Sequence, residues 1–463
     1  MSQSFLCVYL SALRRLQGIQ LLLWLAQHER EKTMQIGTSP QVAELMTTET
    51  LLEDIYIGNW LAWEPRTGEQ LHLPEILTLS ASAWINGPQL GEYYWEGATT
   101  DILARLVKLK ETALATEFLT FTSKQLPWSQ YVQARLYLLK GAYTQASALF
   151  ISAAQGMSKG EVRNDAELLS PHEEASFGSG LVAYYQHIIS LFEKLKAYSY
   201  VVDFAHKALN NTQKVPNFTQ KMAEIDRKKN ATDSPAFDRF NASADELKLL
   251  KKMELHDEIL NRLFIALLAT ARYREAFDAL TDIENRPVKR SCLHKLIEAA
   301  VKSDCVSDFL ALPFSADLAS AADTLLADSA RRELASGSFT TSTPYYQILY
   351  AFRVSRSDFR GAASILYEHL VRLKAVPEHV RDPEDETVVH CYLLLINTLA
   401  CCGEDEAWIL AEPKEGTGEK RGLVRLSDLR REYVADLDRR SEVVLGRFPL
   451  VGGDGGGEAM DVL

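Results

Sequence analysis

Residues 127–150 read PWSQYVQARLYLLKGAYTQASALF. An apolar segment ends in this stretch at Lys140 and Gly141, and a second one begins almost at once at Tyr143. The same arrangement recurs as ILNRLFIALLATARYREAFDAL at 259–280 and as PYYQILYAFRVSRSDFRGAASILYEHL at 344–370. Two helix-forming segments joined by so short a turn predict a helical hairpin.

The second helix of each predicted hairpin has the same spacing of side chains. It opens with an aromatic residue, carries Ala three positions later and has a large apolar residue at the seventh position. Offsets of three and seven lie on one helix face, and a small Ala there lets two helices approach closely. We expect these hairpin-packing positions to be Tyr143, Ala146 and Phe150; Tyr273, Ala276 and Leu280; and Phe359, Ala362 and Leu366.

Helix pairs that share a core in this way predict an all-α fold, an irregular α-helical solenoid of stacked hairpins. Between two of the hairpins, Leu181, Tyr185, Ile188, Phe192 and Leu195 continue the helical periodicity. We divide the chain into N-terminal helices with an insert, helical hairpins, a polar linker, a further part of the solenoid and a disordered glycine-rich tail. These parts span 1–125, 126–210, 211–242, 243–450 and 451–463.

The insert, from about Ile55 to Trp95, differs from the rest of the chain. Gly and Pro interrupt it, and it holds four of the seven tryptophans: Trp60, Trp63, Trp84 and Trp95. These rings could form a contact surface for a partner protein. The alternative, which residue statistics favour, is that they pack on the adjoining helices.

The first helical segment, FLCVYLSALRRLQGIQLLLWLAQ at 5–27, is apolar but broken by Arg14 and Arg15. That break argues against a membrane span and against a signal peptide. A mitochondrial transit peptide stays open as an alternative, because no acidic residue precedes Glu29. We favour a core helix that buries one face, made of Leu13, Leu16, Gln20, Leu23 and Ala26.

Composition and motifs exclude several function classes. The 463 residues carry a net charge of −12, and clustered basic residues are absent apart from 227–229, so direct nucleic-acid binding is not expected. The six cysteines form no CxxC pair, and the segment EGTGEKRG at 415–422 departs from phosphate-loop spacing. We therefore expect no enzyme activity, cofactor or metal site. A helical enzyme whose site is assembled from scattered residues stays open as an alternative.

Five segments together resemble a known family. They are YVQARLYLLKGAYTQASALF (131–150), HDEILNRLFIALLATARYREAFDAL (256–280), RPVKRSCLHKLIEAAVKSDCVSDFLALPF (286–314), YYQILYAFRVSRSDFRGAASILYEHLVRL (345–373) and GEDEAWIL (403–410). Over roughly 125–435 the chain is similar to the helical part of the large arm nucleoporins of the Y-shaped outer-ring complex of the nuclear pore.

The resemblance implies an architectural protein. Members of this family have a β-propeller knitted into a long α-helical solenoid, and they build the outer rings with other Y-complex nucleoporins. It implies a scaffold at the nuclear pore complex in the nuclear envelope, which supports nucleocytoplasmic transport, mRNA export and pore assembly, without catalytic residues. A generic helical-repeat adaptor of a vesicle-coat-like or proteasome-lid-like assembly is the alternative.

The chain departs from the family pattern at both ends. It has too few strand-like residues for a propeller, and its helical part stops near Phe448 before the glycine-rich tail. We expect a fragment that lacks the propeller and the C-terminal helices, so contacts with the hub of the complex are not expected.

Overall fold

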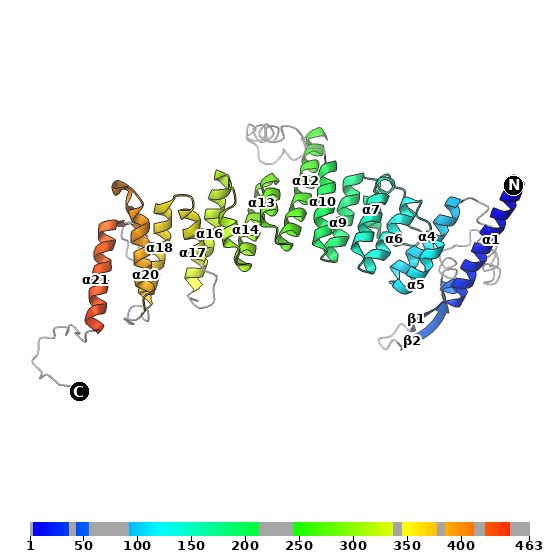
Figure 1. Ribbon diagram of the computed structural model, residues 1–463, viewed down its shortest axis with the longest axis horizontal. Helices are drawn as coiled ribbons and strands as arrows, with labels where there is room; N and C mark the ends of the chain where they lie inside the picture. Colours follow the sequence, from blue (N-terminus) through cyan, green and yellow to red (C-terminus); the bar gives the residue numbers. More distant parts are fainter. Residues whose placement is uncertain are drawn as a thin grey trace, which may run out of the picture. The chain divides into compact units, whose positions relative to one another are not determined.

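The computed structural model describes residues 3–36, 43–54, 92–212, 244–336, 345–376, 385–411 and 422–444. These residues form two compact units, Met1–Ala266 and Leu267–Leu463. In both units, helices consecutive in sequence pair side by side (Figure 1). The predicted all-α class is confirmed, apart from two short antiparallel ribbons.

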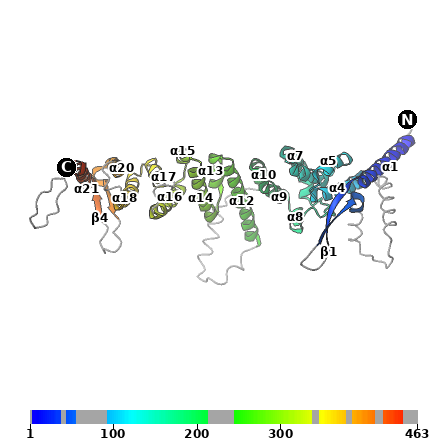
Figure 2. The same ribbon diagram turned by 90° about the horizontal axis from the view of Figure 1, so that it is seen from below.

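The first unit begins with a long helix and a strand pair. Helix α1 (Gln3–Gln27) leads into strands β1 (Glu29–Ile36) and β2 (Ala43–Thr50), which pair from Glu29 opposite Thr50 to Ile36 opposite Ala43. Figure 2 shows this ribbon extending from the end of α1. It lies in a segment that we predicted to be helical, because sequences such as EREKTMQI lack the alternation of apolar and polar residues that identifies a strand.

Helical hairpins make up the rest of the first unit that the structure describes. Helices α4 (Glu92–Lys108) and α5 (Thr112–Phe118) are followed by α6 (Pro127–Leu139), α7 (Tyr143–Ser158) and the short α8 (Pro171–Ser176). Helices α9 (Leu181–Lys194) and α10 (Tyr198–Asn211) form the next pair, and α12 (Ala244–Ala269) begins in this unit.

Aromatic rings form the core of these hairpins. The Tyr131 ring on α6 lies 5.6 Å from Phe150 on α7, and Phe150 lies 6.2 Å from Phe192 on α9. Phe192 in turn stacks on Phe204 of α10 at 5.5 Å. These rings are fully buried and link each hairpin to the next, which is the arrangement expected of a solenoid.

Our prediction of which face the first helix buries is wrong. Leu16 and Leu23 are 52% and 55% exposed, whereas Leu21 and Leu25 are buried. Trp24 packs against Phe118 of α5 at 5.3 Å and turns the helix so that this side faces the unit. The sequence of this helix has apolar residues on every face, so its periodicity could not identify the face that is buried.

The second unit continues the same architecture. It contains α13 (Tyr273–Asp282), α14 (Arg286–Lys302), α15 (Val306–Leu310), α16 (Ala316–Ser336), α17 (Tyr345–Val354), α18 (Phe359–Ala375) and α20 (Thr387–Ala400). A ribbon of β3 (Trp408–Ala411) and β4 (Gly422–Arg425) precedes the last helix, α21 (Leu426–Val444). One apolar cluster joins α18, α20, β3 and α21, with Leu366, Leu370, Tyr392, Ile409 and Leu429 among its members.

Candidate functional site: the turns and junctions between hairpins

One turn geometry closes six helix pairs in the described part of the chain. After α6, the Ala142 amide donates to the Tyr137 carbonyl at 2.9 Å and the Gly141 amide to the Leu138 carbonyl at 3.1 Å. This pair of bonds is the Schellman motif, which requires a residue with positive φ. In the six pairs the residues that take this conformation are Lys110, Gly141, Lys196, Ala271, Asp304 and Ser357. Gly160 makes the same two bonds at the end of α7, where the next helix begins only at Pro171.

The residue after each of these turn residues is the N-cap of the next helix. At Ala142, for example, φ is −84° and ψ is 65°, and the next residue, Tyr143, is already helical. Asp358 is the one such residue whose side chain accepts a hydrogen bond in the described structure, from the Gly361 amide at 2.9 Å. A turn of only three or four residues between the helix bounds holds the two helices close together.

The predicted hairpin-packing positions lie on α7, α13 and α18, the second helix of each pair. The three alanines Ala146, Ala276 and Ala362 are fully buried, and so are Phe150, Leu280 and Leu366. The three aromatic residues at the start of the helices are half-buried. Tyr143 reaches the next hairpin, with its ring 5.9 Å from Tyr200 of α10. Each set therefore combines a buried Ala and a buried apolar residue with a ring at the turn.

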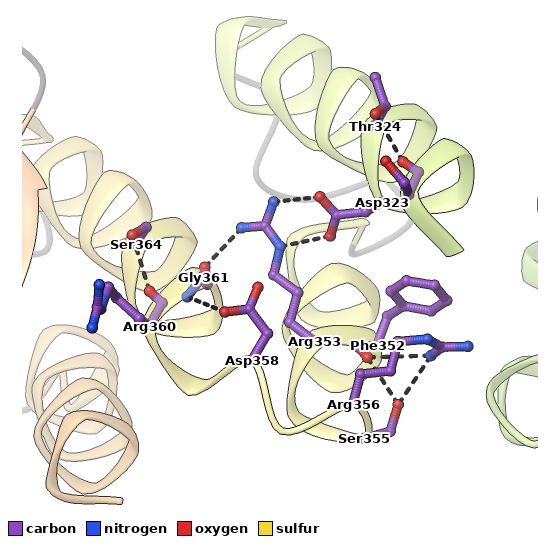
Figure 3. A network of polar contacts seen from close by, with 11 residues as sticks. Asp323, Thr324, Phe352, Arg353, Ser355, Arg356, Asp358, Arg360, Gly361 and Ser364 are labelled. Atoms are coloured by element: carbon purple, nitrogen blue, oxygen red, sulfur yellow. Dashed lines mark hydrogen bonds and ion pairs between the residues drawn. The ribbon is translucent and has the colours of Figure 1, made fainter. Parts of the chain in front are cut away.

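A polar network joins three helices of the second unit (Figure 3). The Arg353 guanidinium on α17 donates to both carboxylate oxygens of Asp323 on α16, at 2.7 and 2.9 Å. It also donates to the Gly361 carbonyl in the first turn of α18 at 2.7 Å. Burial alone would lower the pKa of Arg353. The hydrogen bonds to Asp323 and the charge of Asp323 outweigh burial, so the pKa of Arg353 is raised.

Sequence reasoning missed this network, although a signal was present. In the turn between α17 and α18, the Arg353 backbone carbonyl accepts a hydrogen bond from the Asp358 amide. In the other five turns the residue at that position is apolar: Leu106, Tyr137, Phe192, Leu267 and Ala300. An arginine at a position that is otherwise apolar indicates a charge with a dedicated partner.

Two further arginines hold aromatic rings at the same junction. The Arg356 guanidinium lies 3.8 Å from the centre of the Phe352 ring and 4.9 Å from that of Phe314. Arg360, on α18, lies 4.5 Å from the Trp408 ring of β3. Such cation–π contacts fix the neighbouring elements on α17 and α18.

Buried polar groups of the first unit also serve packing. Glu96 of α4 is fully buried and accepts the Gln125 and Leu126 amides at 2.9 and 2.7 Å, so it caps the start of α6 from a neighbouring helix. The Tyr131 hydroxyl and the Nε2 atom of His187 are hydrogen-bonded at 2.7 Å. Burial lowers the pKa of His187 to about 4, so this imidazole is neutral at pH 7.

Metal binding and nucleophilic chemistry in the described ranges would depend on their titratable groups. Within those ranges, no cluster of His, Cys, Asp and Glu has an arrangement that could hold a metal ion. Burial raises the pKa of the Cys391 thiol to about 12, which makes it a poor nucleophile. Nor does any helix in these ranges have the length and apolar character needed to cross a membrane.

Of the four tryptophans in the predicted contact surface, Trp95 is the one that the structure describes. Trp60, Trp63 and Trp84 lie outside the described residues, as do almost all of the 211–242 linker and the whole 451–463 tail. Trp95 lies in the first turn of α4 and is half-buried.

Comparisons with known proteins place the hairpins in a family. A model of the HEAT repeats of nucleoporin Nup120 matches residues 101–302, and a model of the middle TPR of NUP160/120 matches residues 247–401. The two overlap at α12 to α14, so together they cover 101–401 in chain order. Both describe helical repeats, which confirms the predicted solenoid.

Curated relatives carry the same names. Nucleoporin NUP120 of Chaetomium thermophilum is 34% identical over 365 residues, which are 73% of this chain and 26% of the relative. Nucleoporin nup120 of Schizosaccharomyces pombe is 26% identical over 37% of this chain and 15% of its own length. Nuclear pore complex protein Nup160 of Mus musculus is 26% identical over 34% and 12%. The chain thus spans about a quarter, or less, of the length of these relatives.

Proposed function

The chain belongs to the Nup120/Nup160 family of nucleoporins, and from this premise we propose that it is a structural scaffold of the nuclear pore outer ring. In this role it works without catalysis, at the nuclear pore complex in the nuclear envelope. Its partners are other nucleoporins of the Y-complex. By holding them in place it supports nucleocytoplasmic transport, mRNA export and pore assembly.

The observation that carries the proposal is the ordered match of two nucleoporin repeat models, over 101–401, to a continuous series of hairpins. The polar groups at the hairpin junctions favour the same role. Arg353, Glu96 and His187 are each hydrogen-bonded to neighbouring elements, so these polar groups serve packing. The relatives are nucleoporins, which does not favour a generic adaptor of a vesicle coat or proteasome lid.

Fluorescent tagging of the endogenous gene tests this proposal. We expect a continuous rim of signal at the nuclear envelope and co-purification of the tagged product with Y-complex nucleoporins at matching amounts. The control is the same tagged gene with Ala146→Leu and Ala362→Leu, which overpack two hairpins and should reduce the rim signal. Diffuse cytosolic signal from a stable wild-type product, without nucleoporins in the purified fraction, would contradict the scaffold role.

A further inference from the structure

The β3–β4 ribbon has two faces of different character. Register places Ile409 opposite Val424 on the inner face, and both pack in the apolar cluster of the second unit. Because side chains alternate along a strand, the neighbouring pairs point the other way. The outer face consists of Trp408 opposite Arg425 and of Leu410 opposite Leu423. Figure 2 shows β4 beside α20 and α21.

The outer face carries apolar area that folding does not use. Leu410 is 50% exposed and Leu423 is 49% exposed. The Leu426 amide donates to the Ala407 carbonyl, so alternation along the ribbon makes Leu410 and Leu423 a pair without hydrogen bonds between their backbones. Side chains of such pairs lie close together. The two leucines therefore form one apolar patch on the outer face.

Cationic and aromatic side chains border this patch. The Arg360 guanidinium lies over Trp408, and one of its nitrogens is 3.4 Å from Glu406, which offsets its charge. Arg425 is exposed and forms no ion pair with a described residue; the neighbouring Asp428 carboxylate accepts the Arg425 backbone amide instead. Trp and Arg are among the residue types enriched in binding hot spots.

We propose that the outer face of the β3–β4 ribbon binds a segment of another protein that carries apolar side chains next to carboxylates. The apolar side chains cover Leu410 and Leu423, and a carboxylate pairs with Arg425. Charge complementarity selects this occupant, because the exposed Arg425 guanidinium at the edge of the patch, which has no ion pair among the described residues, can pair with a carboxylate. The proposal deepens the scaffold role, on which it rests, by giving that scaffold a defined docking surface.

Site-specific crosslinking in cells tests the surface on the full endogenous protein. Leu410 is replaced by the photocrosslinking residue p-benzoylphenylalanine, and the crosslinked peptide is identified by mass spectrometry. Leu393 on α20, which is 40% exposed but lies on another element, receives the same replacement as the matched control. We expect position 410, and not position 393, to crosslink to an apolar peptide of another protein with Asp or Glu beside it.

Binding assays with the identified peptide then measure how much Leu423 and Arg425 each contribute to its affinity. The peptide is synthesised with a fluorophore, and its Kd for the purified chain is measured by anisotropy. Leu423→Asp should weaken binding by about tenfold or more, and Arg425→Glu should weaken it and reduce its dependence on salt. Leu393→Asp should leave the Kd unchanged. Thermal unfolding of each variant shows that the ribbon is still folded.

Three outcomes would overturn the proposal. They are a crosslink from position 410 only to this same chain, no crosslink at all, or equal binding by the wild-type protein and Leu423→Asp. Localisation in the same cells separates this result from the scaffold role. Rim signal without an intermolecular crosslink removes the docking surface and leaves the scaffold role intact, whereas loss of the wild-type rim counts against the scaffold role.

Discussion

At the scale of single residues, the hairpin turns are held in a conformation that most side chains avoid. Of the six turn residues with positive φ, Gly141 is the one glycine. A side chain in this region costs about 1–2 kcal/mol, because Cβ crowds the following carbonyl. The Schellman hydrogen bonds and the packing of the two helices offset that cost at the other five positions.

Ala271→Gly should therefore stabilise its turn. Relief of the strain at Ala271 outweighs the added freedom of the unfolded chain, which leaves a net gain of about 0.5–1 kcal/mol. Native-state hydrogen exchange of the Arg272 amide, which donates to Leu267, measures the local opening free energy. Gly141→Ala is the matched control and should lower protection at Ala142. Slower exchange in the control or faster exchange in Ala271→Gly would contradict this account.

The Arg353–Asp323 pair should couple α16 to α17. Asp323→Ala removes two hydrogen bonds to a guanidinium whose side chain is only 16% exposed, and we expect a loss of about 1.5–3 kcal/mol. Arg353→Met removes the charge and should cost less when Asp323 is already Ala. A double-mutant cycle on the unfolding free energy of the second unit measures the coupling, and strictly additive losses would show that the pair has none.

Asp101 should make the stability of the first unit depend on pH. Burial, and next the charge of Asp165, raise its pKa from 3.8 to about 7, although Arg163 and Arg105 oppose the shift. The folded state then binds the proton more tightly than the unfolded state, so the slope of stability against pH is negative. The stabilisation is complete below the unfolded pKa and is lost as the pH rises through about 7.

Thermal unfolding of the first unit at about pH 6 and about pH 8 checks this. The wild type should be less stable at the higher pH, and Asp101→Asn should remove much of that difference. His187, whose pKa is lowered from 6.5 to about 4 by burial, acts in the opposite direction, since its contribution is lost as the pH falls. Its effect extends up to about pH 6.5 and offsets part of that of Asp101 at about pH 6, so the comparison with Asp101→Asn at both pH values isolates the Asp101 contribution. An Asp101→Asn variant with the wild-type pH dependence would contradict the assignment.

At the scale of elements, what the sequence could predict depended on how strongly one periodicity dominated. In α9, Tyr185, Ile188 and Phe192 are buried at the predicted helical spacing, but Leu195 at the end of that stripe is 43% exposed. Apolar residues outside the stripe, such as Tyr184 and Ile189, are buried as well. In α1, apolar residues on every side left the buried face undetermined. The β1–β2 ribbon carries charged residues and threonines, so no strand pattern could identify it.

The candidate site was less accessible to sequence reasoning than the helices. The turn at Gly141 could be predicted because glycine permits positive φ. Alanine and serine rarely adopt positive φ, so the sequence does not indicate that Ala271 and Ser357 take the same conformation. Arg353 binds Asp323, which lies 30 residues earlier in the chain. The two side chains meet because α16 packs on α17, and the sequence alone does not indicate that packing. Glu96 caps α6 from α4 for the same reason.

The buried alanines should set the spacing of the helix pairs. Ala146→Leu and Ala362→Leu each add a side chain where the present one is fully buried, and we expect each to cost about 1–3 kcal/mol. Chemical denaturation followed by tryptophan fluorescence and hydrogen exchange measures the loss. Gln145→Leu, at an exposed position of the same helix, is the control and should change stability by less than about 0.5 kcal/mol. Unchanged stability in both Ala variants would place these residues away from close helix contacts.

At the scale of the whole molecule, stability in a solenoid is the sum of repeats and of contacts between neighbouring repeats. Here the aromatic core of α6, α7, α9 and α10 belongs to the first unit, and the cluster of α18, α20, β3 and α21 belongs to the second. The described residues given for one cluster do not recur in the other. Damage to one hairpin should consequently stay local.

Two overpacking variants on separate units test this directly. Hydrogen exchange of Ala146→Leu should rise in α6, α7 and α9 while amides of α17, α18 and α20 keep their protection, and Ala362→Leu should show the reverse. The double variant should equal the sum of the single effects within about 0.5 kcal/mol, because the sites share no partners. A loss of protection throughout the chain in either single variant would mean that the two units unfold as one. A scaffold made of independent hairpins, by contrast, can lose one repeat locally and still present the docking surfaces of the others.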